Sequence, residues 1–184
     1  MFSYQIDEDT ELRLIEPRHA KQLYDLIERN REHLKEWLGW LRDGHSLEDT
    51  QNFIKRNLIQ LSENNGFTVC IWHKGEIAGQ IGYSYIDWKN RKSEIGYWLG
   101  ASFQGKGFIT QSCRALINHA FNELKLNRVE IHCGAENRKS RKIPVKLGFR
   151  EEGVCRQAGW LYDHFIDIVI YGLLESEWRE QSKK

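Results

Sequence analysis

Two glycines in a short loop form the clearest candidate binding feature of the sequence. Gly105 and Gly107 lie in the stretch Gln104–Ile109, between a predicted strand and a helix predicted to begin near Thr110. Glycine lets the backbone approach a ligand closely, and the first amides of a helix have no partner inside it. Such amides, together with the helix dipole, hold phosphate oxygens. The loop is predicted to bind an anion, although paired glycines also occur in ordinary turns.

The same loop excludes two familiar nucleotide-binding patterns. The dinucleotide-binding pattern needs a third glycine where Thr110 stands, and no Gly-Lys-Ser/Thr of the Walker type follows. If the loop binds an anion, it therefore does so as part of neither of these two patterns.

A second candidate lies where Asn137 and Ser140 begin a helix at the end of a later strand. Asn137 is a favourable helix cap, and its amide could also bind an amide-containing ligand as both donor and acceptor. Ser140 would present its hydroxyl to the same ligand. Taken alone, the helix cap is the simpler interpretation. Pro144 lies within this helix and is predicted to kink it or to deprive Ser140 of its backbone partner.

Two further features accompany these motifs. One side of this helix carries several cations, and the strand before the glycine loop contains a glycine. Such a run of cations is usually a solvated helix face, but beside a phosphate loop it would neutralise a nucleotide. Gly96, inside the strand that precedes the loop, indicates a β-bulge or a close backbone approach. A strand opened there would expose its N–H and C=O groups to an extended ligand, and relief of crowding in the sheet is the alternative. The cations are Arg138, Lys139, Arg141, Lys142 and Lys146.

Hydrophobic periodicity predicts the elements that position these residues. Ser46 and Asp49 resemble a capping box that opens the second helix. The order β-α-α-β-β-β-α-β-α-β-β predicts an α/β fold with a mixed sheet in one domain, spanning 1–184 with its core at about 10–178. The predicted strands are 11–16, 67–72, 76–87, 93–100, 129–133, 150–157 and 164–174, and the predicted helices are 17–40, 46–64, 110–124 and 137–147.

Composition narrows the class of protein. The 27 Lys and Arg residues nearly balance 26 Asp and Glu residues, which argues against a nucleic-acid-binding protein because the phosphate backbone needs a basic footprint. No apolar run is long enough to span a membrane, and the acidic first eleven residues predict no signal peptide. The four widely spaced cysteines predict reduced thiols in a cytoplasmic protein, with no zinc or other metal site.

Taken in order, these motifs resemble the GNAT acetyltransferases. The strand Glu94–Leu99, the loop Gln104–Gly107 with Thr110, the segment Glu136–Ser140, and Lys146–Phe149 follow the pattern of that family, and the resemblance spans Leu12 to Trp178. It is strongest to the RimJ/RimL branch, whose members acetylate the N-terminal amines of proteins. The resemblance implies a GNAT domain with a mostly antiparallel sheet flanked by helices, and an acetyl-CoA-dependent N-acetyltransferase.

The family implies a role for each motif. The backbone amides of the glycine loop would bind the pyrophosphate of acetyl-CoA, and the strand at Tyr97 would pair with the pantetheine arm. Asn137 would bind the pantetheine end, and Ser140 would act as the general acid for the leaving thiolate. The residues expected to bind the cofactor are Tyr97, Trp98, Leu99, Gln104, Gly105, Lys106, Gly107, Phe108, Ile109, Thr110, Asn137 and Ser140.

The general base is left open by the sequence. RimL-like members can have a glutamate just before the aromatic residue that aligns with Trp160, but Gly159 stands at that position here. His132 has a suitable reference pKa, and Glu94 near the expected bulge is a second candidate. Surface or packing roles for both, and a water relay without a dedicated base, are alternatives.

The expected acceptor is a protein N-terminal amine, as on a ribosomal protein. Its pocket is expected to be formed by the connection 37–45, the hairpin with Tyr83 and Tyr85, and the segment 160–164, with Trp40, Tyr83, Tyr85 and Trp160 lining it. Aromatic residues also pack in cores, which is the alternative for these four. A small amine such as a polyamine or an antibiotic is a second possible acceptor, and an acyl-CoA sensor without turnover is an alternative of another class. The aromatic content of 12%, together with the tendency of RimL-like proteins to pair, predicts a homodimer.

Overall fold

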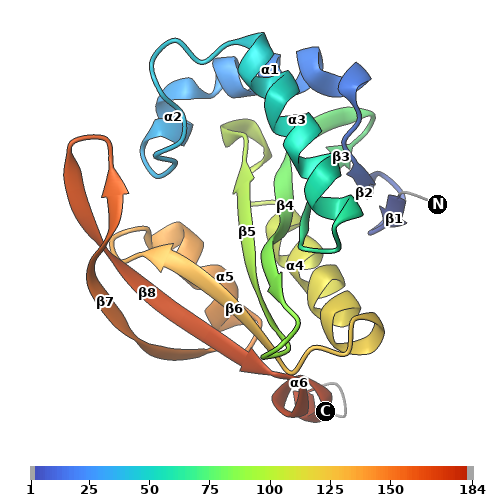
Figure 1. The fold of residues 1–184 in the computed structure, drawn as a ribbon, viewed down its shortest axis with the longest axis vertical. Coiled ribbons are helices and arrows are strands. Elements are labelled where there is room, and N and C mark those ends of the chain that lie inside the picture. The colour runs from blue at the N-terminus through green and yellow to red at the C-terminus, as the bar shows by residue number, and fades with distance from the viewer. Residues whose placement is uncertain (1–2, 182–184) are drawn as a thin grey trace.

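An eight-stranded sheet forms the centre of the computed structural model, which describes residues 3–181 (Figure 1). The strand order is β1-β2-β3-β4-β5-β6-β8-β7, and every neighbouring pair is antiparallel except β5 with β6. The predicted α/β fold with a mixed, mostly antiparallel sheet is thereby confirmed. The strands are β1 (Ser3–Gln5), β2 (Thr10–Leu14), β3 (Phe67–His73), β4 (Glu76–Asp87), β5 (Lys92–Leu99), β6 (Arg128–Gly134), β7 (Arg150–Leu161) and β8 (His164–Leu174).

The parallel pair is short, and this divides the sheet into two arms. β5 and β6 pair only from Lys92 with Arg128 to Glu94 with Glu130. Beyond that point β5 continues along β4 and β6 continues along β8, so the two strands separate (Figure 1). The far side of β5, from Ile95 onward, is left without a neighbouring strand at this edge. The sheet therefore opens as a V between β5 and β6.

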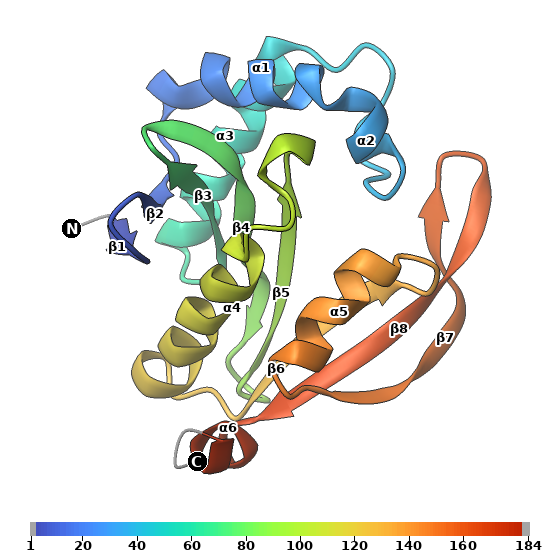
Figure 2. The same ribbon diagram turned by 180° about the vertical axis from the view of Figure 1, so that it is seen from behind.

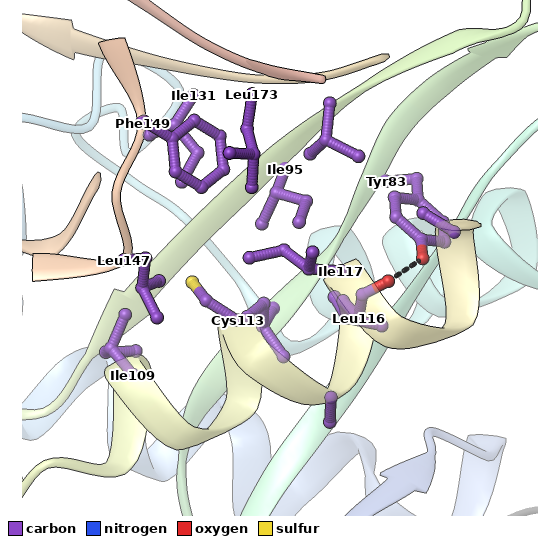
Figure 3. Close-up of a cluster of buried hydrophobic side chains, with 14 of the residues drawn as sticks. Tyr83, Ile95, Ile109, Cys113, Leu116, Ile117, Ile131, Leu147, Phe149 and Leu173 are labelled. Atoms are coloured by element: carbon purple, nitrogen blue, oxygen red, sulfur yellow. Dashed lines mark hydrogen bonds between the residues drawn. The ribbon is translucent and has the colours of Figure 1, made fainter. Parts of the chain in front are cut away.

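Helices cover the two faces of the sheet. α4 (Phe108–Asn118), which continues into a π-helical turn (His119–Glu123), and α5 (Arg138–Lys146) lie on one face, and α1 (Ala20–Arg29) and α3 (Leu47–Ser62) lie on the other (Figure 2). The short α2 (Arg31–Lys35) follows α1, and α6 (Glu175–Gln181) ends the described chain. Figure 3 shows α4 packing its apolar side, which includes Cys113 and Ile117, against the sheet.

Most of the predicted elements are present, and three differences have local causes. The capping box forms, because the amide of Asp49 donates to Ser46 Oγ at 3.2 Å and the amide of Ser46 donates to Asp49 Oδ2 at 2.8 Å. The single helix predicted over 17–40 is instead a 3₁₀ turn (Pro17–His19), α1 and α2. It breaks at Asn30, whose side chain donates to the carbonyl of Leu26 and accepts from the amide of Ala101. β1 and α6 were not predicted.

The bulge lies on β4 rather than at Gly96. Gly96 pairs regularly with Gly82, whereas Ser84 is the extra residue between Tyr83, opposite Ile95, and Tyr85. The predicted bulge at Gly96 is therefore wrong in position. A Cβ at Gly96 would lie 3.3 Å from Ser84 Oγ, so the glycine accommodates the bulge on the neighbouring strand.

This bulge turns two tyrosines to opposite faces. Residues two apart normally share a face of a strand, but the extra residue reverses the alternation. Tyr83 is fully buried in the core, where its hydroxyl donates to the carbonyl of Leu116 at 2.6 Å (Figure 3). Tyr85 pairs with Glu94 and faces the other side. The prediction that Tyr83 lines the acceptor pocket is therefore wrong.

The predicted domain bounds of 1–184 include residues 1–2 and 182–184, which lie outside the described part of the chain. No helix within 3–181 is long and apolar enough to cross a membrane.

Candidate active site

A cleft of about 810 Å³ lies between the two arms. Its walls come from the unpaired end of β5, the glycine loop with the start of α4, the start of α5, and α2 with the residues after it. Eleven of the twelve residues expected to bind the cofactor line this cleft. They are Tyr97, Trp98, Leu99, Gln104, Gly105, Gly107, Phe108, Ile109, Thr110, Asn137 and Ser140.

The remaining residue of that set, Lys106, points elsewhere. Its Nζ lies 5.8 Å from the centre of the Phe103 ring, and Lys106 is not among the cleft-lining residues. The backbone on either side of it still contributes to the wall.

The N-terminus of α4 is open to an anion. Gly107 caps the helix with φ at 84°, in the left-handed region that favours glycine, and makes no side-chain cap hydrogen bond. The amides of Phe108, Ile109 and Thr110 follow, and the first helical amide bond runs from Gln111 to the carbonyl of Gly107 at 3.0 Å. Gly105 also has a positive φ, 77°. These amides point their partial positive charge into the cleft, as a phosphate site requires.

Cations of α5 face the same end of the cleft. Arg138, Lys139, Lys142 and Lys146 line it, whereas Arg141 turns away and donates to the hydroxyl of Tyr171 at 2.9 Å. The predicted cationic face is thus real for four of its five members. Positive side chains on α5 and the amides of α4 together suit a ligand with several negative charges.

Gln104 bridges the mouth of the cleft. Its side-chain nitrogen contacts His33 Nε2 at 2.9 Å, and its side-chain oxygen accepts from Lys139 Nζ at 3.3 Å. His33 belongs to α2 and Lys139 to α5, so this contact joins the two arms beside the glycine loop.

Ser140 lies at the first turn of α5, beside groups from β5 and β6. Its amide donates to Asn137 Oδ1 at 3.0 Å, which confirms Asn137 as the helix cap. Its Oγ lies 3.2 Å from Cys133 Sγ and 3.3 Å from the hydroxyl oxygen of Tyr97. Burial raises the pKa of both the Cys133 thiol and the Tyr97 hydroxyl, so both groups remain neutral and protonated near neutral pH.

The two candidate bases meet at the point where the strands separate. His132 Nδ1 lies 3.3 Å from Glu94 Oε2, and His132 Nε2 lies 2.9 Å from Glu130 Oε2. Because side chains alternate along a strand, this cluster faces away from Cys133 and Tyr97, toward the side of α1 and α3. Neither Glu94 nor His132 lines the cleft volume described above.

The two glutamates of this cluster differ in charge stabilisation. Burial raises the pKa of Glu94, and the nearby His132 opposes that shift. Burial acts in the same direction on Glu130, but hydrogen bonds from Arg128 and His132 outweigh it and lower the pKa of Glu130. Glu130 is thus the fixed anion, and Glu94 is the carboxyl group that holds a proton more readily.

Residues 37–41, here called the strap, cross from α2 to the opposite arm. The hydroxyl of Tyr162, in the turn between β7 and β8, lies 2.8 Å from the carbonyl oxygen of Leu38 and 3.0 Å from that of Leu41, so its single hydrogen is donated to one or shared between the two. A Cβ at Gly39 would lie 3.0 Å from the carbonyl oxygen of Trp160, and one at Gly134 would lie 3.2 Å from the Trp37 ring. The strap therefore closes one side of the V.

The aromatic residues expected around the acceptor are distributed differently. Tyr85 is half-buried beside Glu94. Trp40 within the strap and Trp160 beside it are exposed and do not line the cleft. Trp37 and Leu38, in the connection expected to form the acceptor pocket, do line the cleft. His33, Leu34 and Glu36, just before that connection, line the cleft as well and were not predicted from the sequence. The dense aromatic stretch from Trp37 to Trp40 was the available signal.

A glutamate before Trp160 would not fit in this chain. A Cβ at Gly159 would lie 2.9 Å from Ile166 Cγ1 and 3.0 Å from Ile168 Cδ1. No group of three or more His, Cys, Asp and Glu residues within 3–181 could hold a metal ion.

Comparison with known proteins identifies this arrangement. The model of the acetyltransferase (GNAT) domain matches residues 9–150. The chain belongs to the GNAT acetyltransferase family. It is 39% identical over 180 residues to a putative ribosomal N-acetyltransferase, YdaF, of Bacillus subtilis (strain 168), covering 97% of this chain and 98% of the relative.

Two further relatives fix the branch and the cofactor. The ribosomal-protein-serine acetyltransferase of Escherichia coli (strain K12) is 34% identical over 167 residues, covering 91% of this chain and 93% of that protein. The structure of RimL, a ribosomal L7/L12 alpha-N-protein acetyltransferase, in complex with coenzyme A superposes with a TM-score of 0.91. It is 27% identical and covers 95% of this chain and 99% of its own. The chain is an acetyl-CoA-dependent N-acetyltransferase of the RimJ/RimL type.

The residues present fit acetyl-CoA. The uncapped amides at the start of α4 and the cations of α5 suit its phosphate groups, and the unpaired edge of β5 suits its amide-containing arm.

Replacing Gly107 tests the glycine loop. Gly107→Val forces a β-branched residue into a left-handed backbone conformation, which displaces the amides that face the cleft. Calorimetric titration with coenzyme A is expected to give an affinity lower by roughly tenfold or more, as expected from the loss of a single charge-assisted contact. The matched control is Gly153→Val, because Gly153 has no positive φ and open space around its Cβ position. An unchanged affinity in a folded Gly107→Val protein would contradict the assignment.

Proposed function

We propose that this enzyme acetylates the N-terminal α-amine of a ribosomal protein. The observation that supports this acceptor is the similarity, over nearly the whole chain, to YdaF of B. subtilis and to the ribosomal-protein-serine acetyltransferase of E. coli. These relatives do not favour a small amine or a sensor without turnover. An enzyme that acts on ribosomal proteins works in the cytoplasm, which is the proposed location.

The strap supports an acceptor that enters end-on. Tyr162 and the close contacts at Gly39 and Gly134 hold residues 37–41 across the V. Trp37, Leu38 and Trp98 line the passage below, and the Trp98 indole is held by a hydrogen bond to the buried Gln80 at 3.1 Å. A flexible chain terminus fits such an enclosed passage better than a side chain on a folded surface.

The bound cofactor supplies an acetyl group activated as a thioester, and the chain positions it. The amides at Phe108 to Thr110 and the cations of α5 would bind the phosphates, and the free edge of β5 would pair with the pantetheine arm. Ser140 would then face the sulfur. RimL in its coenzyme A complex has a disulfide between coenzyme A and a cysteine. In this chain Cys133 lies 3.2 Å from Ser140 Oγ.

Acid and base act from opposite faces of the sheet. Ser140 donates a hydrogen bond to the leaving sulfur from the α5 side. The Glu94–His132–Glu130 cluster would accept the proton of the attacking amine from the side of α1 and α3. The two groups would thus act on the leaving sulfur and on the attacking amine separately.

We also propose a homodimer formed through the β7–β8 hairpin. β7 is an edge strand exposed along most of its length, and Val154, Trp160 and Phe165 are more than half exposed. Long edge strands and exposed aromatic residues are typical of surfaces that pair with another chain. Light scattering is expected to give the mass of a dimer over a wide concentration range, and a monomer throughout would contradict this.

Labelled acetyl-CoA tests the acceptor directly. The enzyme is incubated with labelled acetyl-CoA and purified ribosomal proteins, and labelled peptides are located by mass spectrometry. Label is expected on one N-terminal α-amine. The control is the same mixture with N-termini blocked, which should lose the label. Label on lysine side chains, or on polyamines added in competition, would contradict the proposal.

Ser140→Ala tests the role at the sulfur. An interaction made only in the transition state lowers kcat and leaves binding intact. The expected loss in kcat is about 10²-fold, at the low end for acid catalysis because a thiolate leaves readily. KM for acetyl-CoA should change little. A fall in Tm with an unchanged kcat would show instead that Ser140 only supports α5.

The pH dependence of kcat/KM tests the base cluster. Activity requires the Glu94 carboxylate in its unprotonated form, so kcat/KM should rise with pH through the titration of Glu94. Because burial raises the pKa of Glu94, that rise is expected above the ordinary carboxylate range. Glu94→Gln and His132→Asn, compared with wild type, should each lower the plateau and displace this limb. If the rising part of the pH profile lies at the same pH in both variants as in wild type, the cluster is not the general base.

A further inference from the structure

Tyr97 contacts Ser140 at two atoms. Its hydroxyl donates to the carbonyl oxygen of Ser140 at 3.2 Å, and its oxygen accepts from Ser140 Oγ at 3.3 Å. Tyr97 belongs to β5 in one arm, and Ser140 belongs to α5 in the other. Both residues line the cleft. One side chain therefore fixes the backbone and the hydroxyl of Ser140 from across the V.

Pro144 makes the backbone contact available. In a regular α-helix the carbonyl of Ser140 would accept from the amide of residue 144, four positions later. Residue 144 is a proline inside α5, so that amide does not exist. The Tyr97 hydroxyl donates to the carbonyl in its place. The proline that breaks the helical pattern thus leaves an acceptor, and β5 supplies its donor.

The donor count fixes the direction of the second contact. A tyrosine hydroxyl has one hydrogen, and here it points to the carbonyl of Ser140. The Tyr97 oxygen can then only accept, so the hydroxyl hydrogen of Ser140 is the donor between them. Cys133 Sγ also lies within hydrogen-bond distance of the Ser140 hydroxyl, 3.2 Å from its Oγ. The Ser140 side chain is therefore held in place before any ligand enters, and its single hydrogen must turn from the Tyr97 oxygen to reach a leaving sulfur.

We infer that Tyr97 is the positioning residue for Ser140, holding the first turn of α5 and the serine hydroxyl where the leaving sulfur will lie. This inference rests on the proposed role of Ser140. Small displacements of a catalytic group cost large factors in rate, which is why a contact across the two arms matters for turnover.

Tyr171 provides a matched control. Its hydroxyl also anchors α5, because it accepts from Arg141 Nε at 2.9 Å and donates to Glu151 Oε2 at 2.9 Å. Tyr171 is buried and Tyr97 is half-buried, and the hydrogen-bond partners of the Tyr171 hydroxyl are Arg141 and Glu151 rather than Ser140. Removing either hydroxyl weakens the attachment of α5, and only the Tyr97 hydroxyl contacts Ser140.

The experiment compares Tyr97→Phe, Ser140→Ala, the double variant and Tyr171→Phe, with kcat, KM for acetyl-CoA and Tm measured on each under conditions where chemistry limits the rate. Tyr97→Phe is expected to lower kcat by about 10-fold and to change KM by less than about twofold. In the Ser140→Ala background the same change should have no further effect on kcat, because Tyr97 acts through Ser140. Tyr171→Phe should lower Tm and leave kcat unchanged.

Three results would overturn the inference. They are an unchanged kcat in Tyr97→Phe, a loss in kcat that multiplies with that of Ser140→Ala, and an equal loss in kcat in Tyr171→Phe. Failure of the proposed function looks different, because then Ser140→Ala itself would leave kcat intact. A large loss in Ser140→Ala with none in Tyr97→Phe would refute the role of Tyr97 alone.

Discussion

The short parallel pairing of β5 with β6 is the constraint on which the rest of the molecule depends. Three residue pairs, ending at Glu94 and Glu130, are enough to join the arms, and the strands then separate. The backbone N–H and C=O groups of a strand edge without a neighbouring strand still need hydrogen-bond partners. The cleft, the free edge of β5 and the meeting of α4 with α5 follow from that separation. An extended ligand with amide groups satisfies the edge that the sheet leaves open.

Periodicity and capping signals predicted most of the fold, since the patterns they rest on are local. Ser46 with Asp49 and the glycines before α4 behave as their types require. The bulge was harder, because a single extra residue at Ser84 reverses the faces of Tyr83 and Tyr85 without a mark in the local pattern. The break at Asn30 depends on the amide of Ala101, 71 positions along the chain, so no local window contains it.

The candidate site shows the same difference between features that are local in sequence and features that depend on long-range contacts. Residues of the glycine loop and of the first turn of α5 could be predicted, because each motif is contiguous and its chemistry is local. The contacts that join motifs could not. Gln104 with His33, Tyr97 with Ser140 and Tyr162 with the strap all connect segments that approach each other only when the sheet has opened. The two arms thus supply separate chemical groups, and long-range contacts determine their relative positions.

The strap affects how the two arms of the molecule can unfold locally. The arms share little parallel pairing, so the C-terminal arm could open independently as a local unfolding unit. Tyr162 bonded to Leu38 and Leu41, and Trp37 packed over Gly134, tie that arm to the helices of the other. Opening motions of the β7–β8 hairpin must therefore also displace the strap after α2. Amide protection in the two regions becomes thermodynamically linked, and the protein unfolds as one cooperative body despite its divided sheet.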